Sequence, residues 1–368
     1  MDRPLFIGSD IYRRTTFGAK HPLAIQRVPV VVDLCRALGW LDDSVYVESP
    51  MASPAQLARF HDPGYIDALA EAERTQEVSP ERRARYNLGK LENPIHPAMF
   101  SRPATACGGS ILAANLLESG GTIFSPGGGT HHGRCDRASG FCYFNDPVLA
   151  ILTLLDQGLA RIAYVDVDAH HGDGVEAAFA GDTRVRCISV HEAGRWPFTG
   201  LADDRAGGSA RNLPVPAGMN DSEMDYIADR AILPLVQEFV PDAIVVQCGA
   251  DALAEDPLSR QELSNGALWR VVARMISVAP RLLVLGGGGY NPWAVGRCWA
   301  GVWAVLNGLA FPQRLPPSAE AVLRQLVWDR AAGRNPPDAW FTTLADPPRP
   351  GPVRPEVLEV VDLALQPD

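Results

Sequence analysis

The sequence predicts an open, mostly parallel α/β sheet that is covered by helices on both faces. From about residue 120, short apolar runs rich in β-branched residues alternate with helical stretches, a pattern typical of parallel sheets. Four of the five runs end in polar or glycine-rich loops, where ligands bind in such sheets. The predicted strands are GTIFSP (121–126), ARIAYVDVD (160–168), VRCISVH (185–191), AIVVQCG (243–249) and RLLVLGGGG (281–289).

Helical stretches surround these strands. Two of them lie between strands, at 221–240 and 261–279, and two more, at 21–40 and 53–73, make the N-terminal third mostly helical. The tail from about 312 to 368 is rich in proline, and we expect it to wrap the body rather than fold alone. No linker or charge block divides the chain, which predicts a single domain over 1–368.

Composition excludes several classes of protein. The net charge of −10, without long basic runs, argues against a nucleic-acid partner, and no apolar run is long enough to span a membrane. The N-terminus MDRPLFIGSD lacks the apolar core of a signal peptide. The seven cysteines, at 35, 107, 135, 142, 187, 248 and 298, show no paired spacing and are expected to be reduced. These features predict a cytoplasmic protein.

The stretch YVDVDAHHGDG (164–174) places costly polar groups at the end of a buried strand. Asp166, Asp168 and His170 alternate, so on a strand they would share one face. A hydrogen-bonded polar network would satisfy a lone buried carboxylate. However, five of the eight histidines, at 131, 132, 170, 171 and 191, fall in three of these loops. A metal site explains this concentration better.

The donor types favour one transition metal. Asp168 and His170 supply two ligands, and Asp251 follows a neighbouring strand and supplies a third, which leaves a position open for water on Zn²⁺. The same ligands suit Fe²⁺. A dinuclear manganese site would need more carboxylates, but Leu253 stands two positions after Asp251 and the first motif is D-x-H-x-x-D.

The pair His131-His132 follows the glycine-rich turn SPGGG. Adjacent side chains on an extended loop diverge, which predicts that one of them reaches a metal-bound water. Asp166 and Asp173 would fix the imidazole tautomers if each accepts a hydrogen bond from one ring. His171 is assigned to structure.

Tyr290 follows four glycines at a strand end. A phenol on such a loop can donate a hydrogen bond to a developing oxyanion. A tyrosine packed on the loop is the alternative interpretation.

Four site motifs together resemble the zinc-dependent histone deacetylase family, within the arginase/deacetylase superfamily. They are GGGTHHGRCDRASGFCYFND, YVDVDAHHGDGVEAAF, QCGADALAEDPLS and GGGGYNPWAVGRCW. The stretches YNLGKLENPIHPAMF and HDPGYIDALAEAER also fit its branch of bacterial histone-deacetylase-like and acetoin-utilization proteins. The resemblance covers nearly the whole chain.

The resemblance implies a role for each site residue. Zinc would be held by Asp168, His170 and Asp251. His132 would be the general base and then acid, and Tyr290 the donor to the carbonyl. His131 would be an electrostatic partner, and the two imidazoles would be backed by Asp166 and Asp173.

The resemblance also implies a substrate tunnel. Its walls would be Phe141 and Trp196, with Phe198 as an alternative to Trp196, and the Gly140 carbonyl would accept from the substrate amide. Leu258 and Gly288 would line the tunnel, and Arg27 an internal channel near its foot. At the rim, Glu92 stands where many relatives have an Asp that grips the substrate backbone.

Potassium is a further cofactor that the resemblance implies. One ion beside the zinc would use Asp166, Asp168, His170, Ser189 and the Val190 carbonyl. A second, outer ion would involve Phe179, Asp182 and Val185, mostly through backbone oxygens.

The predicted function is hydrolysis of Nε-acyl-lysine amides in a protein or peptide, with a zinc-bound water activated by His132 and the oxyanion stabilised by Tyr290. One alternative is a deacetylase of small molecules such as acetylpolyamines. Another is a catalytically silent acyl-lysine-binding protein, but such a protein would be expected to lack a ligand, a site histidine or Tyr290. The acyl chain, the substrate and the oligomeric state are not predicted.

Overall fold

The computed structural model describes residues 3–14, 17–18 and 20–367, and its centre is one eight-stranded parallel sheet. Neighbouring strands follow the order β2-β1-β3-β8-β7-β4-β5-β6. The strands are β1 (Leu5–Gly8), β2 (Tyr46–Glu48), β3 (Gly121–Ser125), β4 (Ile162–Asp166), β5 (Val185–Glu192), β6 (Ala210–Val215), β7 (Ala243–Gln247) and β8 (Arg281–Leu285). The predicted parallel sheet is confirmed, and all five predicted strands belong to it.

Three strands, β1, β2 and β6, have no counterpart among the predicted ones. β2 and β6 form the two edges of the sheet. β2 has only three residues, and β6 contains Pro214, which an edge strand tolerates because proline lacks a backbone N–H. Neither these edges nor the four-residue β1 carries the long apolar run that reveals an interior strand.

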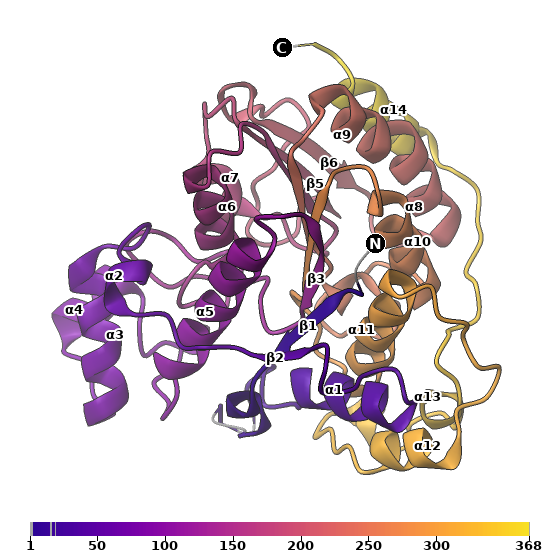
Figure 1. Ribbon diagram of the computed structural model, residues 1–368, viewed down its shortest axis with the longest axis horizontal. Coiled ribbons are helices and arrows are strands. Elements are labelled where there is room, and N and C mark those ends of the chain that lie inside the picture. The colour runs from indigo at the N-terminus through magenta and orange to yellow at the C-terminus, as the bar shows by residue number, and fades with distance from the viewer. Residues whose placement is uncertain (1–2, 15–16, 19, 368) are drawn as a thin grey trace.

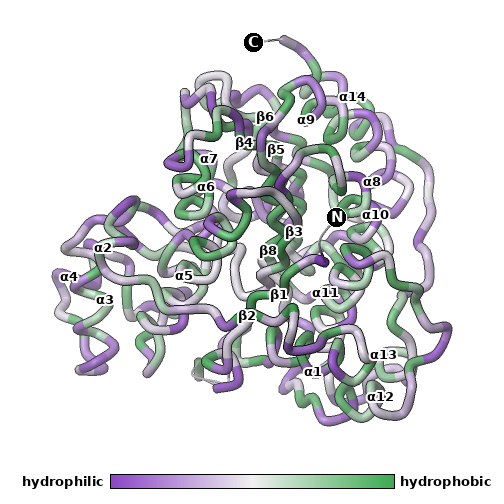
Figure 2. The backbone as a smooth tube through the Cα atoms, viewed as in Figure 1, coloured by the Kyte–Doolittle hydropathy of each residue, from purple (hydrophilic) through white to green (hydrophobic). Residues whose placement is uncertain are grey.

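Helices cover both faces of the sheet (Figure 1), and successive residues of a strand serve opposite faces. On β4, Ala163 and Val165 belong to the larger core, whereas Ile162 and Tyr164 belong to the smaller one. Hydrophobic residues therefore gather along the central strands, as Figure 2 shows. The helices are α1 (Val28–Ala37), α2 (Pro54–Leu57), α3 (Pro63–Thr75), α4 (Pro80–Tyr86), α5 (Ser101–Leu116), α6 (Asp146–Asp156), α7 (Asp173–Ala178), α8 (Asp221–Ile227), α9 (Leu233–Phe239), α10 (Asn265–Met275), α11 (Pro292–Leu306), α12 (Pro317–Arg324), α13 (Ala339–Thr342) and α14 (Pro355–Ala364).

Several helices are shorter than the stretches that predicted them. The stretch 21–40 contains only α1, which begins with Pro29 in its first turn. Proline is accepted there because the first N–H groups of a helix have no intrahelical acceptor. The stretch 221–240 is divided into α8 and α9 by a π-helical turn at Ala228–Ile232. Among the described residues, no helix combines the length and apolarity needed to cross a lipid bilayer.

The tail from residue 312 lies against α11 and its neighbours. Trp328 and Trp340 pack on Trp293, with ring centroids 6.2 and 5.5 Å from it. Arg297 of α11 and Asp346 of the tail form a buried ion pair at 2.5 Å. The tail therefore shares a core with the sheet.

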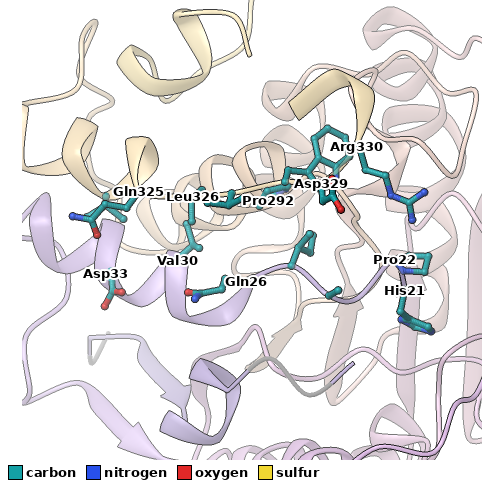
Figure 3. Close-up of a pocket in the computed structure, with 15 residues that line it drawn as sticks. His21, Pro22, Gln26, Val30, Asp33, Pro292, Gln325, Leu326, Asp329 and Arg330 are labelled. Carbon is teal, nitrogen blue, oxygen red and sulfur yellow. The ribbon is translucent and has the colours of Figure 1, made fainter. Parts of the chain in front are cut away.

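A cavity of about 600 Å³ separates the tail from the segment that leads into α1. Figure 3 shows the tail residues Leu326 and Arg330 on one side of it and Pro22, Gln26 and Val30 on the other. A hydrogen bond links the two sides of this cavity: the Arg330 guanidinium donates to the Lys20 carbonyl at 3.2 Å.

Candidate active site

Four loops that follow neighbouring strands meet at one edge of the sheet. The strands β3, β8, β7 and β4 are adjacent and parallel, so their carboxyl ends coincide. A cavity of about 860 Å³ opens at this edge, and its lining includes His132, His170 and Tyr290. The topology thus brings together residues from loops that are far apart in the sequence.

Asp168, His170 and Asp251 form a compact group of metal-ligand types. One donor atom from each lies within 4.8 Å of the other two. Nδ1 of His170 is 3.2 Å from Asp168 Oδ1 and 3.0 Å from Asp251 Oδ2. Both carboxylates are buried. The three side chains expected to hold a metal therefore lie together.

The surroundings orient the two carboxylates toward a cation position. Gln247 Nε2 and the Gly288 N–H each donate to Asp168 Oδ2 at 2.8 Å. A Cβ at Gly288 would lie 2.1 Å from Asp251 Oδ2, so a side chain there would displace the ligand. Burial, followed by the charge of Asp168, raises the pKa of Asp251 to about 6. Two buried carboxylates need a positive partner, and two oxygens with one nitrogen are a donor set that Zn²⁺ accepts.

His131 and His132 converge, whereas their positions on an extended loop predict divergence. Their Nε2 atoms are 2.9 Å apart. The rings do not diverge because the loop turns here, with the His131 N–H donating to the Gly129 carbonyl at 3.0 Å. Each Nδ1 lies 2.7 Å from a carboxylate, Asp166 for His131 and Asp173 for His132. These carboxylates orient the rings as expected for groups behind a metal site.

The two imidazoles differ in protonation. Burial lowers the pKa of His131, but the charges of Asp166 and Asp168 outweigh it and raise this pKa to about 9. Burial and then the charge of His131 lower the pKa of His132 to about 3. At neutral pH the His132 ring is therefore neutral: its Nδ1–H is directed to Asp173, and its Nε2 carries the lone pair that accepts from His131 Nε2 and that a general base requires.

The motif that begins at Asp166 is a turn, not a continuing strand. β4 ends at Asp166, so Asp166, Asp168 and His170 do not share one strand face as their spacing predicts. The Asp168 N–H donates to Asp166 Oδ1 at 3.1 Å, and the His170 N–H donates to Asp168 Oδ1 at 3.0 Å. Such bonds from a carboxylate to the backbone two residues on favour a turn over a strand.

Tyr290 lies at the same cavity and is buried. Its backbone N–H donates to Asp256 Oδ2 at 2.6 Å, which anchors the loop after β8. Burial, followed by the charges of Asp251 and Asp168, raises the pKa of the phenol well above its ordinary value. The hydroxyl therefore remains a hydrogen-bond donor.

Aromatic rings form the walls above these groups. The Trp196 ring lies 4.7 Å from that of His132, and the Phe141 ring 5.8 Å from that of Tyr290. Phe198 also lines the cavity, but its side chain is 72% exposed. Trp196, not Phe198, therefore packs on the His132 ring.

The remaining predicted substrate residues lie at the mouth and behind the site. Leu258 lines the cavity, and the Gly140 N–H donates to the Glu92 carboxylate. The Gly140 carbonyl accepts from Cys142 Sγ at 3.3 Å. Arg27 is separate from them: its Nη1 donates to the Gly287 carbonyl at 2.6 Å, behind the glycine loop.

The residues expected to bind potassium lie on the neighbouring strands β4 and β5, on the turn that follows β4 and on the segment that precedes β5. Asp166 and Ser189 are partners across β4 and β5, and Val190 follows. The Phe179 and Asp182 carbonyls accept from Asp182 N and Val185 N at 3.0 and 3.1 Å. A carbonyl has a second lone pair for a cation.

His171 does not face the cavity. It pairs with Thr199 at 2.8 Å and with Glu176 at 3.0 Å. This placement agrees with the structural role expected for His171.

Four supporting residues were absent from the sequence-based set. Gln247 bonds the metal-ligand group, and the Tyr164 hydroxyl donates to Asp166 Oδ2 at 2.7 Å. Arg134 contacts the Asp173 carboxylate, and Asp256 holds Tyr290. All four lie within the quoted motifs, but Gln247, Arg134 and Asp256 meet their partners only across separate segments, whereas Tyr164 and Asp166 share β4.

The comparisons with known proteins agree with this geometry. A family model described as the histone deacetylase domain matches residues 21–306. The chain belongs to the histone deacetylase family. This deacetylase-family chain is 32% identical to acetoin utilization protein AcuC of Bacillus subtilis (strain 168) over 370 residues, which cover 96% of the chain and 94% of that protein. It is 37% identical to histone deacetylase 9 of Arabidopsis thaliana over 310 residues, which cover 82% of the chain and 72% of that protein.

Solved structures resemble the deacetylase-family chain over 99% of its length. One is an HDAC homologue from Aquifex aeolicus, with 35% identity, a TM-score of 0.93 and full coverage of that chain. Another is an HDAC homologue complexed with SAHA, with 35% identity, a TM-score of 0.94 and full coverage. The arginase/deacetylase-type fold and the branch expected from the motifs are confirmed. Membership of this family makes the chain a hydrolase that acts on acetylated amides.

Proposed function

We propose that this deacetylase-family chain is a zinc-dependent protein lysine deacylase that hydrolyses Nε-acyl-lysine amides. The observation that carries the proposal is the convergence of three elements at one cavity. They are the group Asp168, His170 and Asp251, the paired imidazoles, and the Tyr290 hydroxyl. The relative whose structure is described as complexed with SAHA supports a ligand-binding pocket in proteins of this fold.

Zinc fits the residues that would hold it. Asp168, His170 and Asp251 offer one nitrogen and two carboxylate oxygens, with no thiolate or further carboxylate required. A bound zinc ion would supply Lewis acidity to the amide carbonyl and would lower the pKa of water. Iron(II) is the competing metal for the same donors.

The chain's own residues supply the proton transfers. His132, unprotonated at neutral pH and held by Asp173 through Nδ1, would take the proton of the attacking water at Nε2. The protonated ring would then donate to the leaving lysine amine. The Tyr290 hydroxyl would donate to the oxyanion, while protonated His131 adds a positive charge nearby.

The aromatic walls support a narrow acyl-lysine tunnel between Phe141 and Trp196. The methylene stem of the substrate would lie between the rings, where burial of apolar area is favourable. Glu92 accepts from Gly140, so this rim carboxylate would orient the loop as well as the substrate backbone. Potassium at the two expected positions, the single domain and a cytoplasmic location remain part of this proposal.

The test is steady-state hydrolysis of an acetyl-lysine peptide, followed by mass spectrometry, with zinc and iron measured on each protein. The variants are Asp251→Ala and Tyr290→Phe, and the matched control is Tyr226→Phe on α8, outside the cavity lining. We expect Asp251→Ala to lose metal and activity. Tyr290→Phe should keep metal and lose rate, and Tyr226→Phe should behave like the wild type.

A zinc-loaded wild type that leaves acetyl-lysine and longer acyl-lysine peptides intact would contradict the proposal. Turnover of acetylpolyamines alone would instead identify a small-molecule deacetylase. Acyl-lysine binding without turnover would identify a silent binding protein.

A further inference from the structure

The mouth of the active-site cavity carries four charged side chains besides the catalytic groups. They are Glu92, Glu192, Arg195 and Arg260. A substrate whose acyl-lysine enters the cavity must lay its flanking residues beside these charges. Their state of pairing therefore decides which flanking charge is favoured.

Both carboxylates at the mouth accept hydrogen bonds from the protein, and Glu192 is also paired with a cation. Glu92 accepts from the backbone N–H of Gly140. Glu192 Oε1 accepts from Arg195 Nη2 at 2.8 Å, and Glu192 Oε2 accepts from the Arg260 N–H at 2.8 Å. A cationic flank would have to compete with these donors.

Arg195 is also committed to the protein. Besides its pairing with Glu192, its Nη1 donates to the Leu258 carbonyl at 2.9 Å. The Arg195 guanidinium thus fixes the backbone at Leu258, and Glu192 neutralises the charge of Arg195.

Arg260 differs from the other three. Its backbone is fixed by Glu192, but its side chain is exposed, and its guanidinium makes no hydrogen bond or ion pair with the described residues. It is therefore a positive charge at the cavity mouth with no ion-pair partner in the part of the chain that the structure describes. Two exposed apolar residues also line this cavity: Leu91 is 91% exposed and Phe198 is 72% exposed.

We infer that Arg260 makes this enzyme selective for acyl-lysine sites flanked by an acidic residue. The inference deepens the proposed function and rests on it. A guanidinium pairs well with a carboxylate, often through two hydrogen bonds. The chain's net charge of −10 opposes acidic substrates in general, so the Arg260 guanidinium would supply a local attraction on the lining of the cavity that the substrate enters.

The same charge disfavours acylated polyamines. The remaining amines of such a substrate are cationic and would be repelled by the Arg260 guanidinium, and the Glu192 carboxylate is already paired with Arg195. A peptide with an acidic neighbour is thus the substrate class that the mouth fits best.

The test uses acetyl-lysine peptides in a neutral background, with Glu or Gln at positions −2, −1, +1 or +2. The readout is the ratio of kcat/KM for each Glu peptide to its Gln partner, so a general change in activity cancels. In the wild type at low salt, we expect a Glu preference of about threefold to fivefold at one position or more, as for an exposed ion pair. The preference should shrink at a salt concentration of about 0.5 M, because salt screens exposed charges and the screening length falls to ~3 Å near ~1 M.

Two variants assign the preference to Arg260. Arg260→Gln should bring the ratio to unity, and Arg260→Glu should invert it. Arg314→Gln removes the same charge from an exposed site on the tail outside the cavity lining, and it should keep the wild-type ratio.

Each outcome decides between the proposals. If neutral peptides are hydrolysed but the wild-type ratio is unity or less, or if the preference survives in Arg260→Gln, this inference is overturned and the proposed function stands. If no acyl-lysine peptide is hydrolysed, both are overturned.

Discussion

Gly288→Ala tests whether the glycine loop after β8 makes room for the metal ligands. An added Cβ would lie 2.1 Å from Asp251 Oδ2, 2.6 Å from Asp251 Cγ and 2.8 Å from Asp168 Oδ2. An ordinary contact with a Cβ needs at least about 3.4 Å, so the Asp251 carboxylate must move by roughly 1 Å. It is buried and accepts from the Ala169 N–H at 3.0 Å, so it cannot move without losing that bond.

The displacement should weaken metal binding. Loss of a group that orients metal ligands typically costs about 10- to 100-fold in affinity, which corresponds to about 1.4–2.8 kcal/mol. The assay is chelator competition for Zn²⁺ with the purified variant, together with urea unfolding of the metal-free protein to confirm that it folds. Gly249→Ala, whose Cβ would lie 2.1 Å from Asp168 Oδ2, is a second variant with the same expected result.

Gly266→Ala is the matched control. It lies in α10, where a new Cβ would meet only flexible side-chain atoms at 3.4 Å, and it should keep the wild-type affinity. Zinc binding of wild-type strength in Gly288→Ala and Gly249→Ala would refute the assigned ligand positions.

Four further predictions concern the site and the core. Tyr290→Phe should keep zinc and lower kcat by about 10²- to 10³-fold, because one hydrogen-bond donor to the oxyanion is lost. An unchanged kcat would show that the Tyr290 hydroxyl has no catalytic role. In the metal-free protein, nitrogen NMR of the imidazoles should show His131 titrating near pH 9 and His132 near pH 3, and titration of both near 6.5 would contradict the pairing. Because the folded pKa of His131 is raised, its contribution to stability is complete below pH 6.5 and is lost as the pH rises through about 9, which urea unfolding against pH in wild type and His131→Asn measures. Asp346→Ala should lower the free energy of unfolding by about 3–5 kcal/mol in a single transition, because it leaves Arg297 buried without its partner, and a loss below about 1 kcal/mol would contradict a shared core.

Most of the sheet could be predicted from the sequence, because interior strands carry a local signal. The five apolar runs correspond to β3, β4, β5, β7 and β8, all with two covered faces. The edge strands β2 and β6 escaped prediction because an edge needs no continuous apolar run and tolerates Pro214. Helix ends were less predictable where a proline or a π-helical turn interrupts a continuous apolar pattern.

The candidate site was predictable as a set of residues but not as an arrangement. His170 and Asp251 are 81 positions apart, and only the rule that ligands gather at the carboxyl ends of parallel strands connects them. The same rule says nothing of how a loop turns. For that reason the spacing of Asp166, Asp168 and His170 predicted a strand face where the structure has turns.

The sequence by itself determined which chemical groups exist and which strands deliver them: the motif residues, the parallel sheet and the family. Only the tertiary structure decided how those groups are paired. It sets the Nε2 atoms of His131 and His132 2.9 Å apart, and it engages Glu192 with Arg195 while leaving the Arg260 guanidinium exposed. The physical reason is that protonation and pairing depend on burial and on neighbours within a few ångströms. Such neighbours come from separate segments that meet only when the chain has folded.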